Sequence, residues 1–286
     1  MSVIISSNNY GKSFVRVLKV KRNSNVHEIK EMNVNIQLKG DFEKVHTNGD
    51  NSNVLPTDTM KNTVYVLAKE HHVNSIEEFG KYLAEYFIIN NSQVSGVRIE
   101  IEEKLWNRII IDHNGKQIPH DHAFTGGGSE KRFCKIILQE NKYMISSGMK
   151  DLLVLKTTDS GFENYIKDKY TTLKETPDRV FSTSIRAEWN YANQDLNYSG
   201  VYEKVRKIIL ETFAEHHSLS VQQTLYEAGK NVLETVSELS EISLSMPNKH
   251  YLLFNLAQFG IENNNEIFIP TDEPFGLIEA KLSRSR

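Results

Sequence analysis

The sequence is poor in features that would place it outside an ordinary reducing compartment. Cys134 is the only cysteine among 286 residues, so no intrachain disulfide can form. No apolar run approaches the ~20 residues that a membrane helix needs. The first ten residues lack the regions of a signal peptide, and the last four do not form a Ser-Lys-Leu type peroxisomal ending. We therefore expect a cytoplasmic protein with no membrane partner.

Positive charge is also not in surplus. The chain has 34 Lys and Arg against 37 Asp and Glu, a formal net charge of -3. A protein that binds nucleic acid normally carries a clustered basic surplus that displaces counterions from phosphates. The one basic cluster, Lys19 to Arg22, interleaves with Val20 at the end of an alternating run and is typical of a solvated strand edge. We expect no nucleic-acid partner.

Motifs for cofactors and nucleophiles are missing as well. Gly126-Gly127-Gly128 lacks both the Lys-Ser/Thr of a phosphate loop and the spacing of a dinucleotide fingerprint. There is no Gly-x-Ser-x-Gly elbow, and Cys134 lies in an apolar run that suggests an inert core thiol. His113 and His120-Asp121-His122 offer ligand types that zinc accepts, but in a loop between Pro and Gly they favour packing roles over a metal site.

Hydrophobic periodicity repeats in the same order in both halves of the chain. In the first half, alternation over 14–20 and 34–38 predicts two strands. A helix is predicted over 76–87, with Ser75 as N-cap and Glu78 completing a capping box. Strands return over 97–101, 109–111 and 135–138, and Gly126-Gly127-Gly128 breaks the pattern before the last of these.

The second half follows the same plan. It predicts strands over 152–155 and 181–189, helices over 201–213 and 221–236, and closing strands over 251–256, 267–269 and 277–279. Strands, helices and strands in each half indicate an α+β protein of two domains with antiparallel sheets, over residues 1–139 and 140–286.

One segment carries a more specific pattern. Residues 152–179 contain Leu152-x-Val154-Leu155-Lys156-Thr157-Thr158-x-Ser160-x-Phe162, followed by Tyr165, Tyr170, Leu173 and Arg179. This resembles the signature segment of the urate oxidases (uricases). Three shorter blocks also resemble that family: Tyr10-Gly11-Lys12, Thr57-Asp58-Thr59-Met60-Lys61-Asn62-Thr63 after Gly49-Asp50-Asn51, and Pro247-Asn248-Lys249-His250. The resemblance spans about residues 10–280 and is greatest to bacterial-type members.

The resemblance implies a fold and an assembly. Family members have two tandem tunnelling-fold (T-fold) domains, each an antiparallel sheet with helices on one face. Their subunits associate into a tunnel-shaped homotetramer with active sites at subunit interfaces. Lys12, Thr57 and His250, far apart in sequence, would then meet across such an interface.

It also implies a substrate site for urate, a flat anion. Arg179 would present a planar fork to two of its acceptors. Gln222 would hold another edge with its amide, helped by the backbone of Val221. Phe162 would stack on the purine face, and Asp58 would be a positioning residue. Without the resemblance, composition favours structural roles for the same residues: a surface ion pair for Arg179, a helix face for Gln222 and a core position for Phe162.

The implied chemistry needs no metal or organic cofactor, because deprotonated urate itself gives electrons to O2. Lys12, Thr57 and His250 resemble the proton relay of the family. The Asn248 amide would polarise the oxygen or water above the ring. The products would be 5-hydroxyisourate and hydrogen peroxide, in the first step of urate degradation toward allantoin.

Three alternatives stay open at this level. Another T-fold purine or pterin enzyme, such as a cyclohydrolase, would use zinc and would be sensitive to a chelator. A non-catalytic purine-binding protein would bind urate and leave it unchanged in air. A scaffold would bind nothing. The presence of Lys12, Thr57, Asn248 and His250 together favours the enzyme, because not all four are needed to grip a purine.

Overall fold

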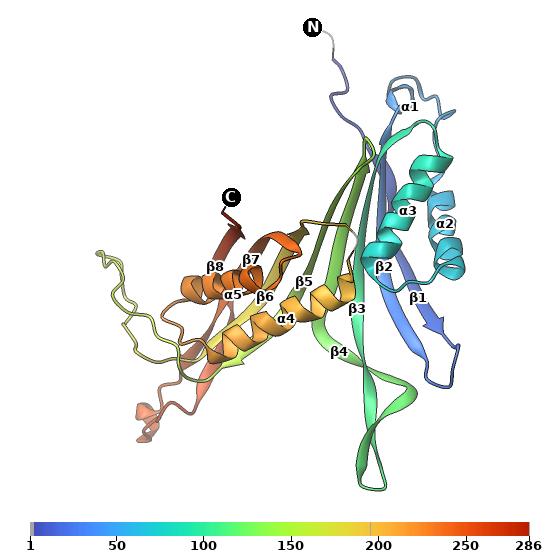
Figure 1. Cartoon of the computed structure of the whole chain (residues 1–286). Helices are drawn as coiled ribbons and strands as arrows, with labels where there is room; N and C mark the ends of the chain where they lie inside the picture. Colours follow the sequence, from blue (N-terminus) through green and yellow to red (C-terminus); the bar gives the residue numbers. More distant parts are fainter. Residues whose placement is uncertain (1–2, 195, 286) are drawn as a thin grey trace. The chain divides into compact units, whose positions relative to one another are not determined.

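The computed structural model describes residues 3–194 and 196–285, and their helices and strands are drawn in Figure 1. The chain forms two compact units, Met1–Gly148 with Asn197–Ser199, and Met149–Leu196 with Gly200–Arg286. The predicted domain boundary at residue 139 lies before the division at Gly148, in the turn between two strands, and it stays a prediction. Each unit is an antiparallel sheet whose neighbouring strands are also neighbours in the chain.

Unit 1 contains the predicted strands and the predicted helix over 76–87, together with two helices that were not predicted. The strands are β1 (Tyr10–Lys21), β2 (Glu28–Gly40), β3 (Val94–His113), β4 (Lys116–Gln139) and the first half of β5 (Lys142–Lys156); the helices are α1 (Glu43–Asn48), α2 (Thr57–Glu70) and α3 (Ile76–Asn90). Helices α2 and α3 cover one face of the sheet (Figure 1). Gly80 of α3 faces Ile101 and Ile136 of the strands beneath it.

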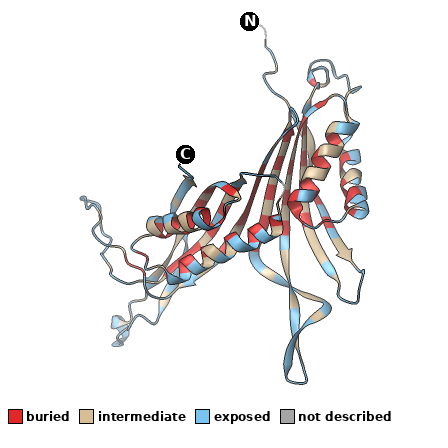
Figure 2. Ribbon diagram, viewed as in Figure 1, coloured by how far each residue is buried: buried red, intermediate tan, exposed pale blue. Residues whose placement is uncertain are grey.

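The alternation of β2 shows why this sheet has one buried face. Its residues Ile36 and Leu38 are fully buried, and they pair with Ile99 and Val97 of β3. Successive side chains of a strand point to opposite faces, so every second residue faces the helices. Buried residues accordingly alternate along the strands and line the inner sides of the helices (Figure 2).

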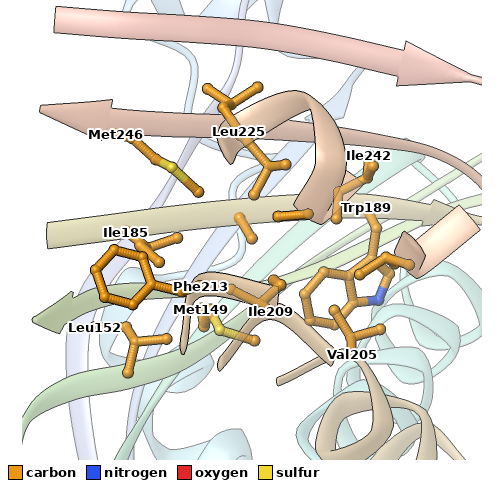
Figure 3. Packing of buried hydrophobic residues seen from close by; sticks show 14 of the residues in the cluster. Met149, Leu152, Ile185, Trp189, Val205, Ile209, Phe213, Leu225, Ile242 and Met246 are labelled. Carbon is orange, nitrogen blue, oxygen red and sulfur yellow. The ribbon is translucent and has the colours of Figure 1, made fainter. Parts of the chain in front are cut away.

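Unit 2 repeats this arrangement with its own core. Its strands are the rest of β5, β6 (Phe181–Tyr191), β7 (Leu239–Leu253) and β8 (Phe268–Ser283); its helices are α4 (Tyr198–Glu215), α5 (Val221–Thr235) and the short 3-10 turn η1 (Ala257–Phe259). The predicted apolar face of β6 is confirmed, because Phe181, Ile185 and Trp189 are at most 1% exposed. Leu225 of α5 and Met246 of β7 point into the same core (Figure 3).

Helix α3 begins as the capping pattern predicts. The Ser75 hydroxyl accepts a hydrogen bond from the Glu78 amide at 3.1 Å and so satisfies one of the free N–H groups of the first turn. This local signal was sufficient because an N-cap acts only on the residues that follow it.

At three places the structure differs from the sequence prediction. The glycine triplet at 126–128 lies within β4 and does not end it, although the register with β3 shifts there: Gly126 pairs with Trp106, and the next pair along the ladder is Lys131 with Lys104. Gly128 has a φ of 92°, a conformation that favours glycine, so the triplet forms an irregularity inside one long strand. Strand β7 begins at Leu239 and not near Tyr251. Its buried residues Ile242, Leu244 and Met246 alternate with serines, a strand pattern that the prediction overlooked.

The third difference is α2, which no sequence pattern was used to predict. Its buried residues are Met60, Val64, Leu67 and Ala68, a spacing that follows one helical face. The signal was present but weak, because polar and β-branched residues fill the rest of the segment.

Unit 1 also buries an ion pair. Glu77 is fully buried in the first turn of α3, and its carboxylate accepts hydrogen bonds from the Arg132 guanidinium and the Ser147 hydroxyl, both at 2.6 Å. Arg132 also donates to the Ser199 hydroxyl at 3.2 Å. A buried pair of this kind ties α3 to the sheet, and removal of one partner leaves the other charge without compensation.

We therefore expect Glu77→Gln to lower the free energy of unfolding by about 3 kcal/mol or more, because it leaves a buried guanidinium without its carboxylate. Glu78→Gln, one residue further on the exposed side of the same turn, is the matched control and should change it by less than about 0.5 kcal/mol. Urea unfolding followed by circular dichroism measures both. Equal effects of the two substitutions would contradict the role given to the buried pair.

Candidate functional site

The predicted site residues of unit 1 lie where β1 meets the start of α2. The Tyr10 hydroxyl accepts from the Leu55 amide at 2.8 Å and donates to the Leu55 carbonyl at 3.2 Å. This pins the segment before Thr57, the first residue of α2, to the start of β1. Lys12 follows Tyr10 on β1 and is half-buried, as is Thr57.

The backbone of β1 is unusual beside Lys12. A Cβ at Gly11 would lie 1.8 Å from the Ile36 carbonyl oxygen, so only glycine permits this approach of β1 to β2. After Lys12 the strand register shifts, and Phe14 has a φ of 58° with its amide bonded to the Asn35 side chain. A bulge of this kind changes the direction of the neighbouring side chains, and bulges often lie next to active sites.

Asp58 is exposed at the start of α2 and is paired locally. A hydrogen bond from Lys61 lowers the pKa of Asp58, and the charge of Lys12 lowers it further. Asp58 also accepts from the Asn62 amide at 3.1 Å. Lys12 is thus close enough to the first turn of α2 for their charges to interact.

In unit 2 the segment 157–179 folds back on itself. The Phe162 and Thr176 backbones exchange hydrogen bonds at 2.8 and 3.2 Å, and the Arg179 amide donates to the Ser160 carbonyl at 2.7 Å. A Cβ at Gly161 would lie 2.9 Å from the Pro177 carbonyl oxygen, so this close approach requires glycine. Phe162 and Arg179, seventeen residues apart, become neighbours.

Their side chains are in contact. The Arg179 guanidinium lies 5.5 Å from the centre of the Phe162 ring, and Tyr165 stacks on Phe162 at 4.9 Å with an angle of 14°. Burial lowers the pKa of Arg179, which stays charged because its ordinary pKa is so high. Its buried Nε has no hydrogen-bond partner within the described part of the chain. The result is a half-buried cation beside an aromatic face.

The same segment contacts the start of α5. Ser160 forms a parallel bridge with Ser218, and the Gly161 amide donates to the Ser218 carbonyl at 2.8 Å. Ser220 caps α5 by accepting from the Gln223 amide. Val221 is buried and Gln222 is exposed in the first turn, so the Gln222 amide is presented at the end of α5 that adjoins the Phe162 segment.

Asn248 and His250 lie on β7 of unit 2. Asn248 is opposite Thr183 of β6 and Gly276 of β8, and the ladder shifts register between Asn248 and His250. The buried Thr183 hydroxyl has no partner among the described residues. Since Arg179 precedes β6 by two residues, Arg179 and Asn248 lie at the same end of the β6–β7 ladder.

The structure therefore groups the predicted residues by unit. Lys12, Thr57 and Asp58 come together in unit 1; the unit 2 residues are Phe162, Arg179, Val221, Gln222, Asn248 and His250. The sequence indicates no role for Tyr10 beyond its place in a motif, and none for Asp178. The Tyr10 hydroxyl bonds to both backbone groups of Leu55, and the Asp178 carboxylate bonds to Thr158 and Ser160. Contacts of this kind leave no signal in a single sequence.

The histidines that suggested a metal do not lie in a loop. His120 and His122 are on β4, with ring centres 4.6 Å apart. Across residues 3–194 and 196–285, no group of three His, Cys, Asp or Glu residues has the geometry to hold a metal ion. Within the same described residues, no helix is both long and apolar enough to cross a membrane.

Known proteins match this chain over nearly its whole length. The sequence model of the family described as Uricase matches residues 8–137 and 145–279. Uricase of Arthrobacter globiformis is 44% identical over 99% of this chain and 90% of its own length. Uricase of Dictyostelium discoideum is 40% identical, over 97% of this chain and 96% of its own.

A solved structure agrees with the sequence matches. The crystal structure of uricase from Arthrobacter globiformis superimposes with a TM-score of 0.93, covering 100% of this chain and 97% of that one at 44% identity. The arrangement of β1 with α2, the folded segment from 157 to 179 and the family match point the same way: the chain belongs to the uricase family.

Proposed function

We propose that this protein oxidises urate with O2 and water to 5-hydroxyisourate and hydrogen peroxide, using neither a metal nor an organic cofactor. The names of its relatives support the reaction. The observation that carries it is the half-buried Arg179 guanidinium beside the Phe162 ring, which suits a flat anionic ring.

In this proposal unit 2 binds the substrate. Arg179 forms two parallel hydrogen bonds to urate acceptors, and Phe162 stacks on the ring face. Gln222 and the Val221 backbone hold the opposite edge. Because Tyr165 stacks on Phe162, that ring is fixed before substrate arrives, which reduces the ordering cost of binding.

Unit 1 supplies proton transfer. Lys12 and Thr57 form a relay with His250, in which the hydroxyl both accepts and donates a proton. Asp58 positions the first turn of α2, and the Asn248 amide polarises O2 or water above the ring. Urate gives up protons and two electrons, O2 takes both as peroxide, and water supplies the hydroxyl oxygen.

The two sets of residues lie in different units. We propose that association of several copies of the chain brings them together. The protein would form a homotetramer in which Lys12 and Thr57 of one copy complete the site of Arg179 and His250 of another. The ranges 1–139 and 140–286 would each be one T-fold domain.

The first experiment follows urate by its near-ultraviolet absorbance in air, with hydrogen peroxide assayed in parallel and excess EDTA present. We expect loss of urate with an equal amount of peroxide, unaffected by EDTA. Inhibition by EDTA would favour a zinc-dependent T-fold enzyme. Binding of urate without its loss would indicate a purine-binding relative, and either result would contradict the proposal.

Lys12→Met removes the first group of the relay and should lower kcat about 10²–10⁴-fold, the usual range for loss of general acid–base catalysis. Urate affinity measured without oxygen should change little, because Lys12 is not part of the clamp. Lys21→Met on the same strand is the control, since Lys21 is partly exposed and pairs with Glu28. Near-normal turnover in Lys12→Met would contradict the assignment of Lys12 to the proton relay.

Arg179→Lys replaces a planar fork with a point charge, so it should mainly weaken binding. We expect the Kd for urate under anaerobic conditions to rise about tenfold to a hundredfold, the value of one charged hydrogen bond. Arg186→Lys, at an exposed position of β6 that pairs with Glu188, should leave Kd unchanged. An unaltered Kd in Arg179→Lys would rule out the clamp.

A further inference from the structure

Asp178 carries a negative charge directly before Arg179 in the sequence, yet its carboxylate is directed elsewhere. Oδ2 accepts from the Thr158 hydroxyl at 2.7 Å, and Oδ1 accepts from the Ser160 amide at 3.3 Å. Within the part of the chain that the structure describes, no ion pair joins Asp178 to Arg179. Adjacent opposite charges normally attract, so this arrangement needs a reason.

These two bonds fix one segment against another. Thr158 and Ser160 lie on the segment that contains Phe162. Asp178 lies on the segment that contains Arg179. The Asp178 carbonyl also accepts from the Thr176 hydroxyl at 2.6 Å, a local bond that stiffens the Asp178 segment itself. The bond from Thr158 lowers the pKa of Asp178, so the carboxylate is ionised at neutral pH and its acceptors are strong.

The segment is held on its other side too. The Ser218 amide donates to the Asp159 carbonyl at 3.0 Å, and the His217 ring contacts the Asp159 carboxylate. Residues 158–162 are therefore fixed between the segment that contains Arg179 and the start of α5. The side-chain bonds of Asp178 act at the residue directly before the cation, beside the main-chain bond from the Arg179 amide to the Ser160 carbonyl.

We propose that Asp178 is a positioning and specificity-determining residue for the substrate clamp. It sets the distance between the Arg179 guanidinium and the Phe162 ring, and its engagement with Thr158 and Ser160 keeps its own charge from neutralising Arg179. The cation is thereby reserved for an anionic substrate. This inference rests on the proposed function of Arg179 and adds a second residue that acts through it.

The test measures anaerobic urate Kd in a double-mutant cycle of Asp178→Asn and Arg179→Gln. We expect Asp178→Asn alone to raise Kd about tenfold, which corresponds to loss of charged hydrogen bonds, with a smaller change in kcat. In the Arg179→Gln background the same substitution should change Kd by less than about twofold, because the cation that it positions is gone. A general folding defect would weaken binding equally in both backgrounds.

Two further variants sharpen the result. Thr158→Val removes the hydroxyl that occupies Oδ2 and should weaken urate binding about threefold, again only when Arg179 is present. Asp168→Asn is the matched control: its carboxylate closes an exposed turn with Tyr170 and Thr171, and Kd should stay unchanged.

The outcomes separate the two proposals. Normal urate binding by Arg179→Gln overturns the clamp itself. Weak binding by Arg179→Gln together with normal binding by Asp178→Asn overturns only the role of Asp178. Equal losses from Asp178→Asn with and without Arg179 also overturn it, because the residue then acts on folding and not on the cation.

Discussion

The close backbone contact of residues 160–162 with two other segments is the constraint on which the proposed substrate clamp depends. Through it Ser160 bonds to Arg179, Phe162 to Thr176, and Gly161 to Ser218. These are main-chain bonds with little freedom of geometry, and a side chain at Gly161 would prevent them. A cation, an aromatic ring and a helix start are thus fixed relative to one another without any regular secondary structure.

The same principle operates in unit 1 by different means. There one phenol, that of Tyr10, satisfies both backbone groups of Leu55 and thereby positions the first turn of α2 beside β1. Its ring packs edge-on against Phe42 at 4.7 Å, so the hydroxyl is held by a buried neighbour. In both units the sheet is the support, and irregular backbone next to it holds several of the proposed site residues, as is common for functional loops.

Buried polarity is distributed unevenly and with a purpose. The Glu77–Arg132 pair in unit 1 also bonds to two serines and serves the fold. The Arg179 Nε and the Thr183 hydroxyl are buried without partners among the described residues, at the end of the β6–β7 ladder where Asn248 lies. Unmatched buried donors are costly, and they are retained most readily where a ligand can satisfy them.

Much of the fold was determined by the sequence through local periodicity. The face of β6, the cap of α3 and the helices α4 and α5 follow from spacing alone, because side-chain direction repeats every two residues in a strand and about every 3.6 in a helix. The family resemblance likewise rests on residues that can be read in order. Three features were missed: helix α2, the continuation of β4 through its glycines, and the start of β7, whose apolar residues alternate with serines.

The site depended on contacts between residues distant in the chain. Sequence alone named Arg179, Phe162 and Gln222, but the approach of Ser160 to Arg179 and Ser218 was decided only by tertiary packing. The same holds for the orientation of Asp178, since a carboxylate bonds to whichever donors the fold brings near it. Periodicity specifies which face a residue occupies; only the folded chain specifies its neighbour, because that neighbour is fixed by long-range backbone bonds that leave no pattern in the sequence.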